Sequence, residues 1–222
     1  YLIDPNDSKV IWKSESQNIP LRTKGASKPL YLNNTVFIAR DNGSISSYNA
    51  LDGTLNWFTI ISSRSGRNDL ESQRDAEMQI SIDDGKLYYG HFQGELTALD
   101  INTGNIIWTS PFSFINDIII NDNAIYGSTS GKELVSIDQA SGFLNWRSKM
   151  SSEEFTQPFI VEDLVMAFTT QGTFVAFNKD GTNIYQEKFD LDIHPQTKFI
   201  LDGNKLYFQT IDGDIVHFVI TI

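Results

Sequence analysis

Side chains that could carry out acid–base or metal chemistry are few in this chain and stand far apart. The three histidines, His91, His194 and His217, show no paired-ligand spacing, so we expect each to be an ordinary strand or loop residue. A Gly-x-Ser-x-Gly sequence, which would place a nucleophilic serine on a sharp turn, does not occur. We therefore predict no catalytic residue and no metal site.

Pairs of carboxylates occur, but their positions favour a structural role. They stand at turns between predicted strands, where an aspartate accepts hydrogen bonds from backbone N–H groups and is solvated. The pairs are Asp83–Asp84, Asp190/Asp192 and Asp212/Asp214. Catalysis and calcium binding are the less favoured alternatives, and the sequence contains no twelve-residue calcium-binding loop.

The segment 127–133 (GSTSGKE) is similar to a phosphate-binding loop but departs from it in two ways. It has one residue too few between its glycines, and Lys132 is not followed by Ser or Thr. Because the segment lies within a predicted hairpin, we interpret it as a turn.

The stretch 94–108 (GELTALDINTGNIIW) carries an aspartate, a turn glycine and a strand that ends in a tryptophan. Stretches 42–57, 130–146 and 171–186 follow the same pattern, with Asp or Asn, a turn glycine and a strand that ends in a bulky residue. An interval of eight residues separates Asp4 from Trp12, Asn49 from Trp57, Asp100 from Trp108 and Asp138 from Trp146. A pattern that repeats along the whole chain indicates a structural module rather than an active site.

The period of this repeat predicts the fold class. Turn glycines at 43, 94, 131, 172 and 213 are separated by 51, 37, 41 and 41 residues, and a four-stranded propeller blade needs about 40 to 45. A β-prone run precedes each turn, at 35–40, 86–91, 124–128, 164–169 and 205–209. Helical periodicity is absent, and Asn, Asp and Gly mark every break. We predict an all-β protein, a β-propeller of four-stranded antiparallel blades with about five blades present.

The repeat also predicts the organisation of the domain. One propeller occupies residues 1–222, with full blades at 28–60, 78–110, 114–149 and 155–189. Residues 1–15 are expected to be the end of a blade, and residues 196–222 the strands of a final blade. Because the chain starts in the middle of a blade, we expect an N-terminally truncated fragment.

The geometry of stacked blades explains the residue types of the repeat. The gap between neighbouring sheets widens outward, so a large flat side chain fills it while its indole N–H finds a polar partner. We expect this role for Trp12, Trp57, Trp108 and Trp146. In the turn between the strands, we expect Asp100 and Asp138 to accept backbone N–H bonds and Gly104 and Gly142 to supply the positive φ.

Composition excludes several classes of function. The 222 residues carry a formal net charge of −11, which argues against broad nucleic-acid binding and against adhesion to anionic lipid through a basic face. The absence of cysteine excludes disulfides, thiolate metal sites and a cysteine nucleophile. No apolar run approaches the roughly 18 residues of a membrane span.

Two segments depart from the repeat, and we predict that they carry the function. The first is 16–25, and the second is 62–77, which accounts for the 51-residue interval between turn glycines. An insertion on one face of a propeller is where binding surfaces are usually built. The alternative is a surface loop that is merely tolerated.

The repeat, in its form G-x-[apolar]-x-A-L-D-x-x-T-G-x-x-x-W, resembles that of the PQQ-type β-propellers. Within this family the chain is similar to the lipoprotein propellers of the outer-membrane β-barrel assembly machinery, most specifically at 66–80, 94–108 and 121–138. The resemblance implies an eight-bladed ring, of which this chain matches the C-terminal part. It also implies no enzymatic activity, no cofactor, and a lipid anchor upstream that holds the protein at the periplasmic face of the outer membrane of a Gram-negative bacterium.

The resemblance further implies a partner and the residues that bind it. The partner is BamA, bound through its periplasmic POTRA domains, and unfolded barrel precursors are a possible second partner. The family's L-x-L-R motif corresponds here to Ile19-Pro20-Leu21-Arg22, and its D-x-D motif to Asp75-Ala76-Glu77. By this resemblance Arg22 forms an ion pair with the partner, Ile19 and Leu21 are apolar anchors, and Asp75 and Glu77 are acidic partners or loop braces. An arginine flanked by apolar anchors is typical of an interface hot spot.

Two other classes of function stay open from the sequence. A PQQ-dependent dehydrogenase uses the same blades, but such enzymes resemble a longer ring with a vicinal cysteine pair and calcium-binding carboxylates, and this chain has no cysteine. A generic peptide-binding propeller would add an extended strand to an exposed sheet edge.

Overall fold

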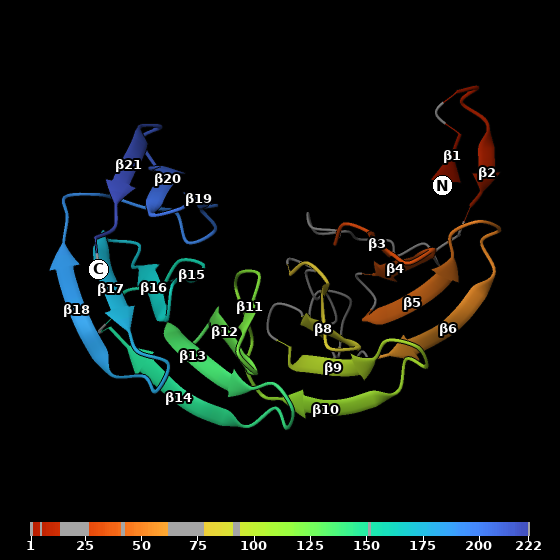
Figure 1. The fold of residues 1–222 in the computed structure, drawn as a ribbon, viewed down its shortest axis with the longest axis horizontal. Coiled ribbons are helices and arrows are strands. Elements are labelled where there is room, and N and C mark those ends of the chain that lie inside the picture. The colour runs from red at the N-terminus through yellow and green to blue at the C-terminus, as the bar shows by residue number, and fades with distance from the viewer. Residues whose placement is uncertain are drawn as a thin grey trace, which may run out of the picture. The chain divides into compact units, whose positions relative to one another are not determined.

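The computed structural model describes residues 2–4, 6–13, 27–40, 43–61, 78–90, 94–150 and 152–221. In these residues the regular secondary structure consists of strands, which form six antiparallel sheets (Figure 1). The chain divides into two compact units, Tyr1–Pro111 and Phe112–Ile222. Each unit is described by itself.

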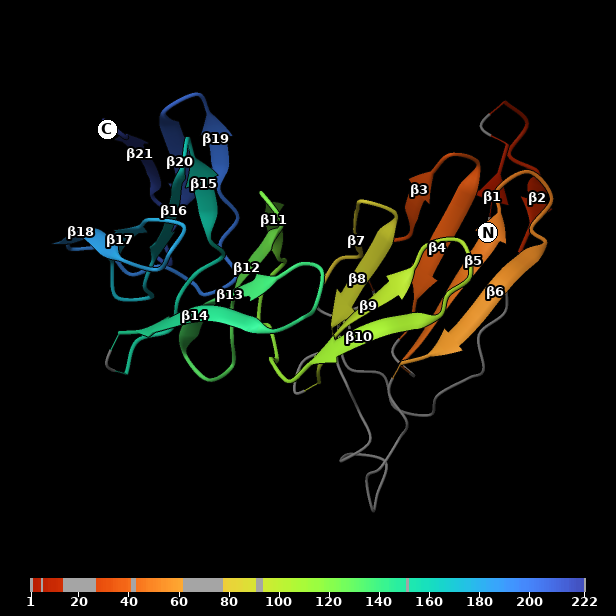
Figure 2. The ribbon, with the colours of Figure 1, turned by 60° about the horizontal axis from the view of Figure 1, so that its bottom comes forward.

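The first unit holds a two-stranded sheet and two four-stranded sheets (Figure 2). The small sheet is β1 (Leu2–Ile3) with β2 (Val10–Trp12). The next sheet is β3 (Leu30–Leu32), β4 (Thr35–Ala39), β5 (Ser44–Asn49) and β6 (Leu55–Ile60). The third is β7 (Ser81–Asp83), β8 (Lys86–Gly90), β9 (Leu96–Asp100) and β10 (Ile106–Ser110).

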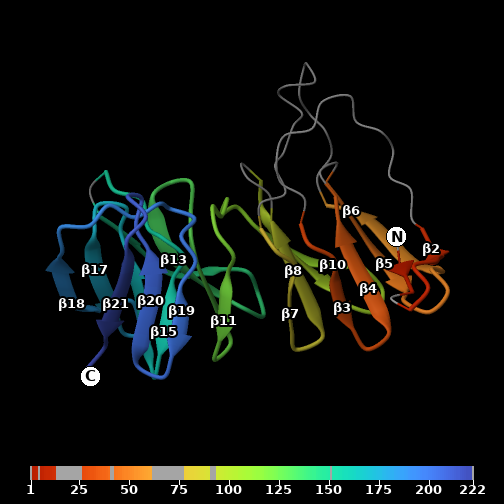
Figure 3. The same cartoon turned by 90° about the horizontal axis from the view of Figure 1, so that it is seen from above.

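The second unit holds two four-stranded sheets and one of three strands (Figure 3). The first is β11 (Ile119–Asn121), β12 (Ala124–Ser128), β13 (Glu133–Asp138) and β14 (Leu144–Lys149). The second is β15 (Phe159–Val161), β16 (Leu164–Phe168), β17 (Thr173–Phe177) and β18 (Asn183–Lys188). The last is β19 (Ile200–Asp202), β20 (Lys205–Gln209) and β21 (Ile215–Val219).

The middle strands of the four-stranded sheets form the core because sheets cover both of their faces. In β9, for example, Leu96, Ala98 and Leu99 are fully buried although they point to opposite faces. In the second unit, Phe177 and Tyr126 belong to a buried cluster shared by the sheets β11–β14 and β15–β18. A second cluster, which includes Phe168 and Phe208, joins the sheets β15–β18 and β19–β21.

Each four-stranded sheet has a shift of register between its third and fourth strands. The shift falls at Ser47/Tyr48, Ile106/Trp108, Ser136/Ile137 and Ala176/Phe177. An irregularity of this kind bends a strand and redirects its side chains. In three sheets the shift lies at the repeat tryptophan, so the backbone there departs from the regular hydrogen-bond ladder of a β-sheet.

In the turn between the second and third strands, the structure differs from the predicted repeat in which residue adopts the left-handed conformation. The left-handed residue is Gly43 in one sheet and Gly172 in another, but in the sheet β11–β14 it is Lys132, with φ 61°, rather than Gly131. Lys132 N–H donates to Thr129 O, as Gly172 N–H donates to Thr169 O, so the two residues are equivalent. The Lys132 ammonium also donates to Ser152 O at 2.7 Å, a contact that glycine could not make.

Candidate partner-binding end of the sheets

The residues predicted to bind a partner are Ile19, Leu21, Arg22, Asp75 and Glu77, and all five lie outside the described residues. The structure does describe the residues on either side of the two segments that contain them. Those flanking residues show where each segment leaves a sheet and where it returns.

Both segments attach to the same end of the sheet β3–β6. The second leaves after β6, where Ile61 N–H donates to Gly43 O at 2.9 Å, beside the β4–β5 turn. The first enters β3, which is antiparallel to β4: its initial residue Leu30 pairs with Phe37 and its last residue Leu32 with Thr35, so β3 begins on the side where β4 ends. Since β4 ends at the same β4–β5 turn, both connections lie at one end of this sheet.

A side-chain hydrogen bond joins the return points of the two segments. Lys28 N–H donates to Gln79 Oε1 at 3.0 Å, across 51 residues of sequence. The neighbours of these residues are fixed by burial, since Ser27, Met78 and Ile80 are each no more than 5% exposed. The two predicted partner-binding segments therefore end at adjoining points, which this hydrogen bond joins; we call it the Lys28–Gln79 bridge.

A half-buried cation lies at this end of the sheet. Arg40, directly after β4, donates from Nη1 to Ser46 Oγ at 2.5 Å and from Nη2 to Tyr48 Oη at 3.0 Å. Its guanidinium also lies 5.9 Å from the centre of the Tyr48 ring. Tyr48 in turn stacks on Trp12, the last residue of β2, with ring centres 6.0 Å apart. These contacts tie β2, which precedes the first segment, to the sheet that follows it.

Sequence analysis did not find Arg40 or the Lys28–Gln79 bridge. The bridge could not be predicted from the sequence, because neither a backbone N–H nor a glutamine side chain indicates which distant residue it will bind. For Arg40 the signal was weak: an arginine at the end of an apolar strand, with hydroxyl residues at alternate positions on the next strand.

At the opposite end of the sheets, the repeat tryptophans pair neighbouring sheets. In three of them the indole N–H donates, at 2.8–2.9 Å, to the carbonyl of the residue that follows the repeat Asp or Asn of the next sheet. The pairs are Trp12 with Ala50, Trp57 with Ile101 and Trp146 with Lys179. Trp108 is 9% exposed and contacts Tyr88 of its own sheet, with ring centres 5.8 Å apart.

Two constraints require glycine in the turn beside Trp12, Trp57 and Trp146. Gly104 has φ 71°, and a Cβ built on it would lie 2.4 Å from the Trp57 ring. Gly53 stands in the same relation to Trp12, and Gly181 to Trp146. Gly142 also has positive φ, 75°. The glycine therefore provides both the left-handed turn and the space for the indole.

The aspartate of the repeat shapes the same turn through its carboxylate. Asp100 Oδ1 accepts the N–H groups of Asn102 at 3.0 Å and Thr103 at 2.8 Å. Asp138 Oδ1 accepts the N–H of Ser141 at 2.8 Å and its hydroxyl at 2.5 Å.

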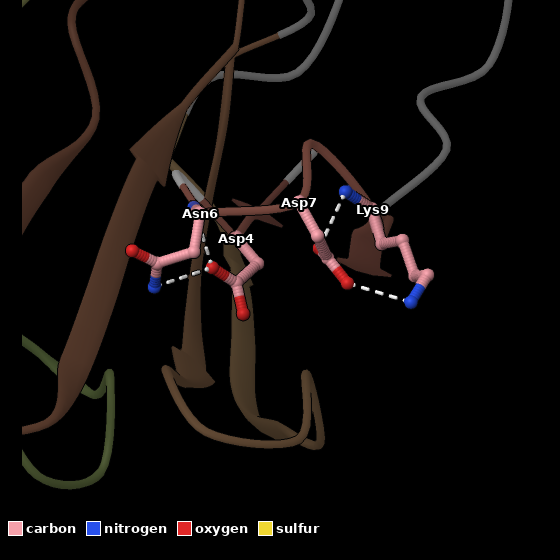
Figure 4. Close-up of polar contacts among 4 residues, drawn as sticks. All are labelled: Asp4, Asn6, Asp7 and Lys9. Carbon is pink, nitrogen blue, oxygen red and sulfur yellow. Dashed lines mark hydrogen bonds and ion pairs between the residues drawn. The ribbon is translucent and has the colours of Figure 1, made fainter.

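The turn between β1 and β2 uses the same arrangement (Figure 4). Asp4 Oδ1 accepts the N–H of Asn6 at 2.8 Å, and Asp7 next to it holds Lys9 by a 2.6 Å ion pair.

Hydrogen bonds to the turn carboxylates lower the pKa of Asp100 and of Asp138, and they make the stability of the fold depend on pH. The hydrogen bond from the Ser141 hydroxyl is the main reason why the pKa of Asp138 lies below its ordinary value of 3.8, and the hydrogen bond from the Ser141 N–H lowers it further. Because the folded pKa is the lower one, this stabilisation is complete above the unfolded pKa and is lost as the pH falls through the folded value. We expect the free energy of unfolding, measured in urea between about pH 2.5 and 7, to fall below about pH 4.

The matched variant is Asp138→Asn, whose amide oxygen can still accept a hydrogen bond but does not titrate. Its unfolding free energy should fall less steeply in acid than that of the unmodified chain. Parallel acid profiles for the two proteins would contradict the assigned role of this carboxylate.

Two further observations concern the described part of the chain. No group of three or more His, Cys, Asp or Glu side chains there could hold a metal ion. No helix in that part is long and apolar enough to cross a membrane.

Comparison with solved structures identifies the class of the fold. The chain superposes on BamB from Moraxella catarrhalis with a TM-score of 0.81 and 21% identity, covering 98% of this chain and 66% of that one. It also matches a europium-containing methanol dehydrogenase, with a TM-score of 0.61 and 14% identity over 75% of this chain and 41% of that one. The prediction of an all-β propeller with four-stranded blades is thereby confirmed.

Comparison of sequences identifies the family. The family model described as "Outer membrane protein assembly factor BamB" matches residues 1–142 and 121–221, so the chain belongs to this family. The BamB of Yersinia pestis is 23% identical over 218 residues, which cover 97% of this chain and 55% of that protein. The BamB of Escherichia coli is 25% identical over 197 residues, covering 88% and 50%. The chain thus spans about half the length of the curated relatives it matches.

Proposed function

We propose that this protein is a non-enzymatic scaffold of the machinery that assembles outer-membrane β-barrel proteins, and that it binds the POTRA domains of BamA. The observation that carries the proposal is the match of nearly the whole chain to the BamB family model. The Lys28–Gln79 bridge adds support, because it joins the points at which the two segments that resemble the family's partner-binding loops end.

The proposed contact combines one charge with apolar anchors. Arg22 pairs with a carboxylate of the POTRA domain, while Ile19 and Leu21 bury apolar surface beside it. Asp75 and Glu77 supply acidic partners or brace the loop. The protein acts at the periplasmic face of the outer membrane, held there by a lipid anchor on the full-length protein, and assists the insertion of barrel precursors.

Charge reversal at one residue tests this contact. We expect Arg22→Glu to weaken binding to purified BamA POTRA domains by about tenfold to a hundredfold, because it replaces an attraction with a repulsion at the centre of the interface. The measurement is a titration by biolayer interferometry, preceded by a thermal melt to show that the variant is folded.

The matched control is Arg147→Glu, which makes the same charge change at an exposed position on β14. It should bind like the unmodified chain. Equal affinities for both variants and the unmodified protein would disprove the Arg22 contact. Reproducible dye-linked alcohol oxidation with added PQQ and calcium would overturn the scaffold function itself.

A further inference from the structure

A polar cavity lies between the two four-stranded sheets of the first unit, β3–β6 and β7–β10. It has a volume of about 430 Å³ and lies beside the β3–β4 turn, at the end of the sheets away from the Lys28–Gln79 bridge. Its floor is formed by Phe37 and Ser47, which are 2% and 1% exposed. The side chains of Asn33, Asn56 and Asn102 stand on its exposed rim.

An ion-pair cluster spans the equivalent place between the two four-stranded sheets of the second unit. Lys179 Nζ donates to Asp163 Oδ1 at 2.5 Å and also to Asp122 Oδ2. Asp122 lies in the β11–β12 turn of one sheet, whereas Asp163 and Lys179 lie in turns of the next sheet. The lysine side chain therefore bridges the gap between the sheets, and we call this cluster the Lys179 clamp.

The first unit has uncharged residues where the Lys179 clamp has its charges. Ile101 corresponds to Lys179, because the carbonyl of each accepts the indole N–H of the preceding sheet's tryptophan. Asn33 corresponds to Asp122, because each is the first left-handed residue of the turn between the first and second strands, with φ 48°. Ile101 and Asn33 both line the cavity. The cavity therefore occupies the place that the clamp spans in the second unit.

A buried hydroxyl in the floor of the cavity also lacks a partner that its equivalent has. Ser47 and Ser136 each accept a hydrogen bond from an asparagine side chain of the next strand, at 3.2 and 3.3 Å. Ser136 also forms a hydrogen bond with the hydroxyl of Tyr126, its partner on the neighbouring strand. The partner of Ser47 is Phe37, which has no hydroxyl. Among the described residues, the Ser47 hydroxyl thus has no acceptor for its proton, and a buried donor without an acceptor is costly.

The chemistry of the lining decides which kind of ligand fits. The described residues that line the cavity are all uncharged, so an ionic ligand would lose water without gaining a counter-charge. The amide groups on the rim each offer donors and an acceptor side by side, which suits a ligand whose groups both donate and accept. Leu32, Phe37 and Ile101 add apolar surface to the same cavity.

We propose that this cavity binds a neutral sugar of one or two rings. Adjacent ring hydroxyls, which each donate and accept, bond to the amides of Asn33, Asn56 and Asn102. One sugar oxygen accepts the proton of Ser47, and the C–H face of the ring packs on the apolar side chains. The volume falls within the roughly 300–1,000 Å³ of small-molecule sites. The proposal does not rest on the proposed function.

The test is saturation-transfer difference NMR on the unmodified protein with four probes. Maltose and chitobiose are the neutral sugars, glucuronate is the charged sugar, and a capped trialanine is the uncharged peptide. We expect at least one neutral sugar to bind with a Kd of about 1 mM or lower, and glucuronate and the peptide to bind at least about tenfold more weakly. The side-chain amide resonances of Asn33, Asn56 and Asn102 should shift when the sugar is added.

A double substitution that copies the second unit tests the cavity directly. Asn33→Asp combined with Ile101→Lys places the ion pair of Asp122 and Lys179 between the sheets of the first unit. We expect it to weaken sugar binding at least about tenfold, because the lysine side chain fills the cavity and brings a charge into it. Thermal melts should show little change in stability, since an exposed ion pair contributes little.

A second variant has a matched control in the other unit. Asn56→Ala removes a rim amide and its hydrogen bond to Ser47, and Asn145→Ala removes the equivalent bond to Ser136. We expect Asn56→Ala to weaken sugar binding about fivefold to tenfold, because one hydrogen bond to the sugar is lost. The Asn145→Ala variant should bind the sugar like the unmodified protein.

Several results would overturn the proposal. Neither neutral sugar giving saturation transfer at about 10 mM would exclude a site of the expected affinity. Tighter binding of the peptide or of glucuronate would make the ligand a peptide or an anion instead. Equal losses in the Asn56 and Asn145 variants, or undiminished binding in the double variant, would place the sugar elsewhere on the protein. POTRA binding should be unchanged in the Asn56 variant, so failure here is distinct from failure of the scaffold function.

Discussion

Replacing Gly104 by alanine should destabilise the first unit by about 3 kcal/mol, the sum of two costs. A left-handed backbone costs an L-residue about 1–2 kcal/mol, and Gly104 has φ 71°. The new Cβ would also lie 2.4 Å from the Trp57 ring, and relieving such an overlap in a packed site costs about 1–3 kcal/mol. The measurement is urea unfolding followed by far-UV circular dichroism, which does not depend on the fluorescence of Trp57.

Gly85 provides a control with nearly the same backbone and open space. Its φ is 70°, and nothing lies within 4 Å of a Cβ built on it. Gly85→Ala should therefore cost only the backbone part, about 1–2 kcal/mol. If the two alanine variants are equally stable, the contact between Trp57 and the turn does not constrain Gly104.

Replacing Trp57 by alanine should have the largest effect of any single substitution considered, a loss of about 3–5 kcal/mol. Trp57 is 8% exposed, packs against Phe37 and donates its indole N–H to Ile101 O at 2.9 Å. Alanine removes the packing and leaves the carbonyl of Ile101 without this donor. Trp57→Phe, which keeps most of the ring but not the N–H, should lose about 1–2 kcal/mol. Both losses are measured by the same urea unfolding.

The double variant separates packing from backbone strain. With Trp57 replaced by alanine, the closest overlap at residue 104 is removed and only Thr59 Oγ1, 2.9 Å from the new Cβ, still crowds it, so adding Gly104→Ala should cost little more than Gly85→Ala. A coupling energy of about 1–3 kcal/mol is therefore expected between positions 57 and 104. Additive losses would mean that the indole moves aside at no cost, which its hydrogen bond and burial argue against.

The local elements of this protein could be predicted from its sequence. The β-prone runs at 124–128 and 205–209 coincide with β12 and β20, because buried strands are continuous apolar runs and their turns require Asn, Asp or Gly. Even so, the left-handed position at 132 was missed, since a lysine there has no turn signature and depends on contacts to Ser152 and Thr129. The partner-binding residues, led by Arg22, stay predictions, because they lie outside the described residues.

What the sequence by itself determined is the repeat: its period, its strands, and the residue types of its turns, all of which depend on neighbours a few positions away. Only the tertiary structure decided which groups meet across sheets. It placed Gln79 against Lys28 over 51 residues of sequence, and it decided which carbonyl oxygens accept the indole N–H groups of Trp12, Trp57 and Trp146. A hydrogen bond between sheets depends on how the sheets stack, and a local sequence pattern does not encode that stacking.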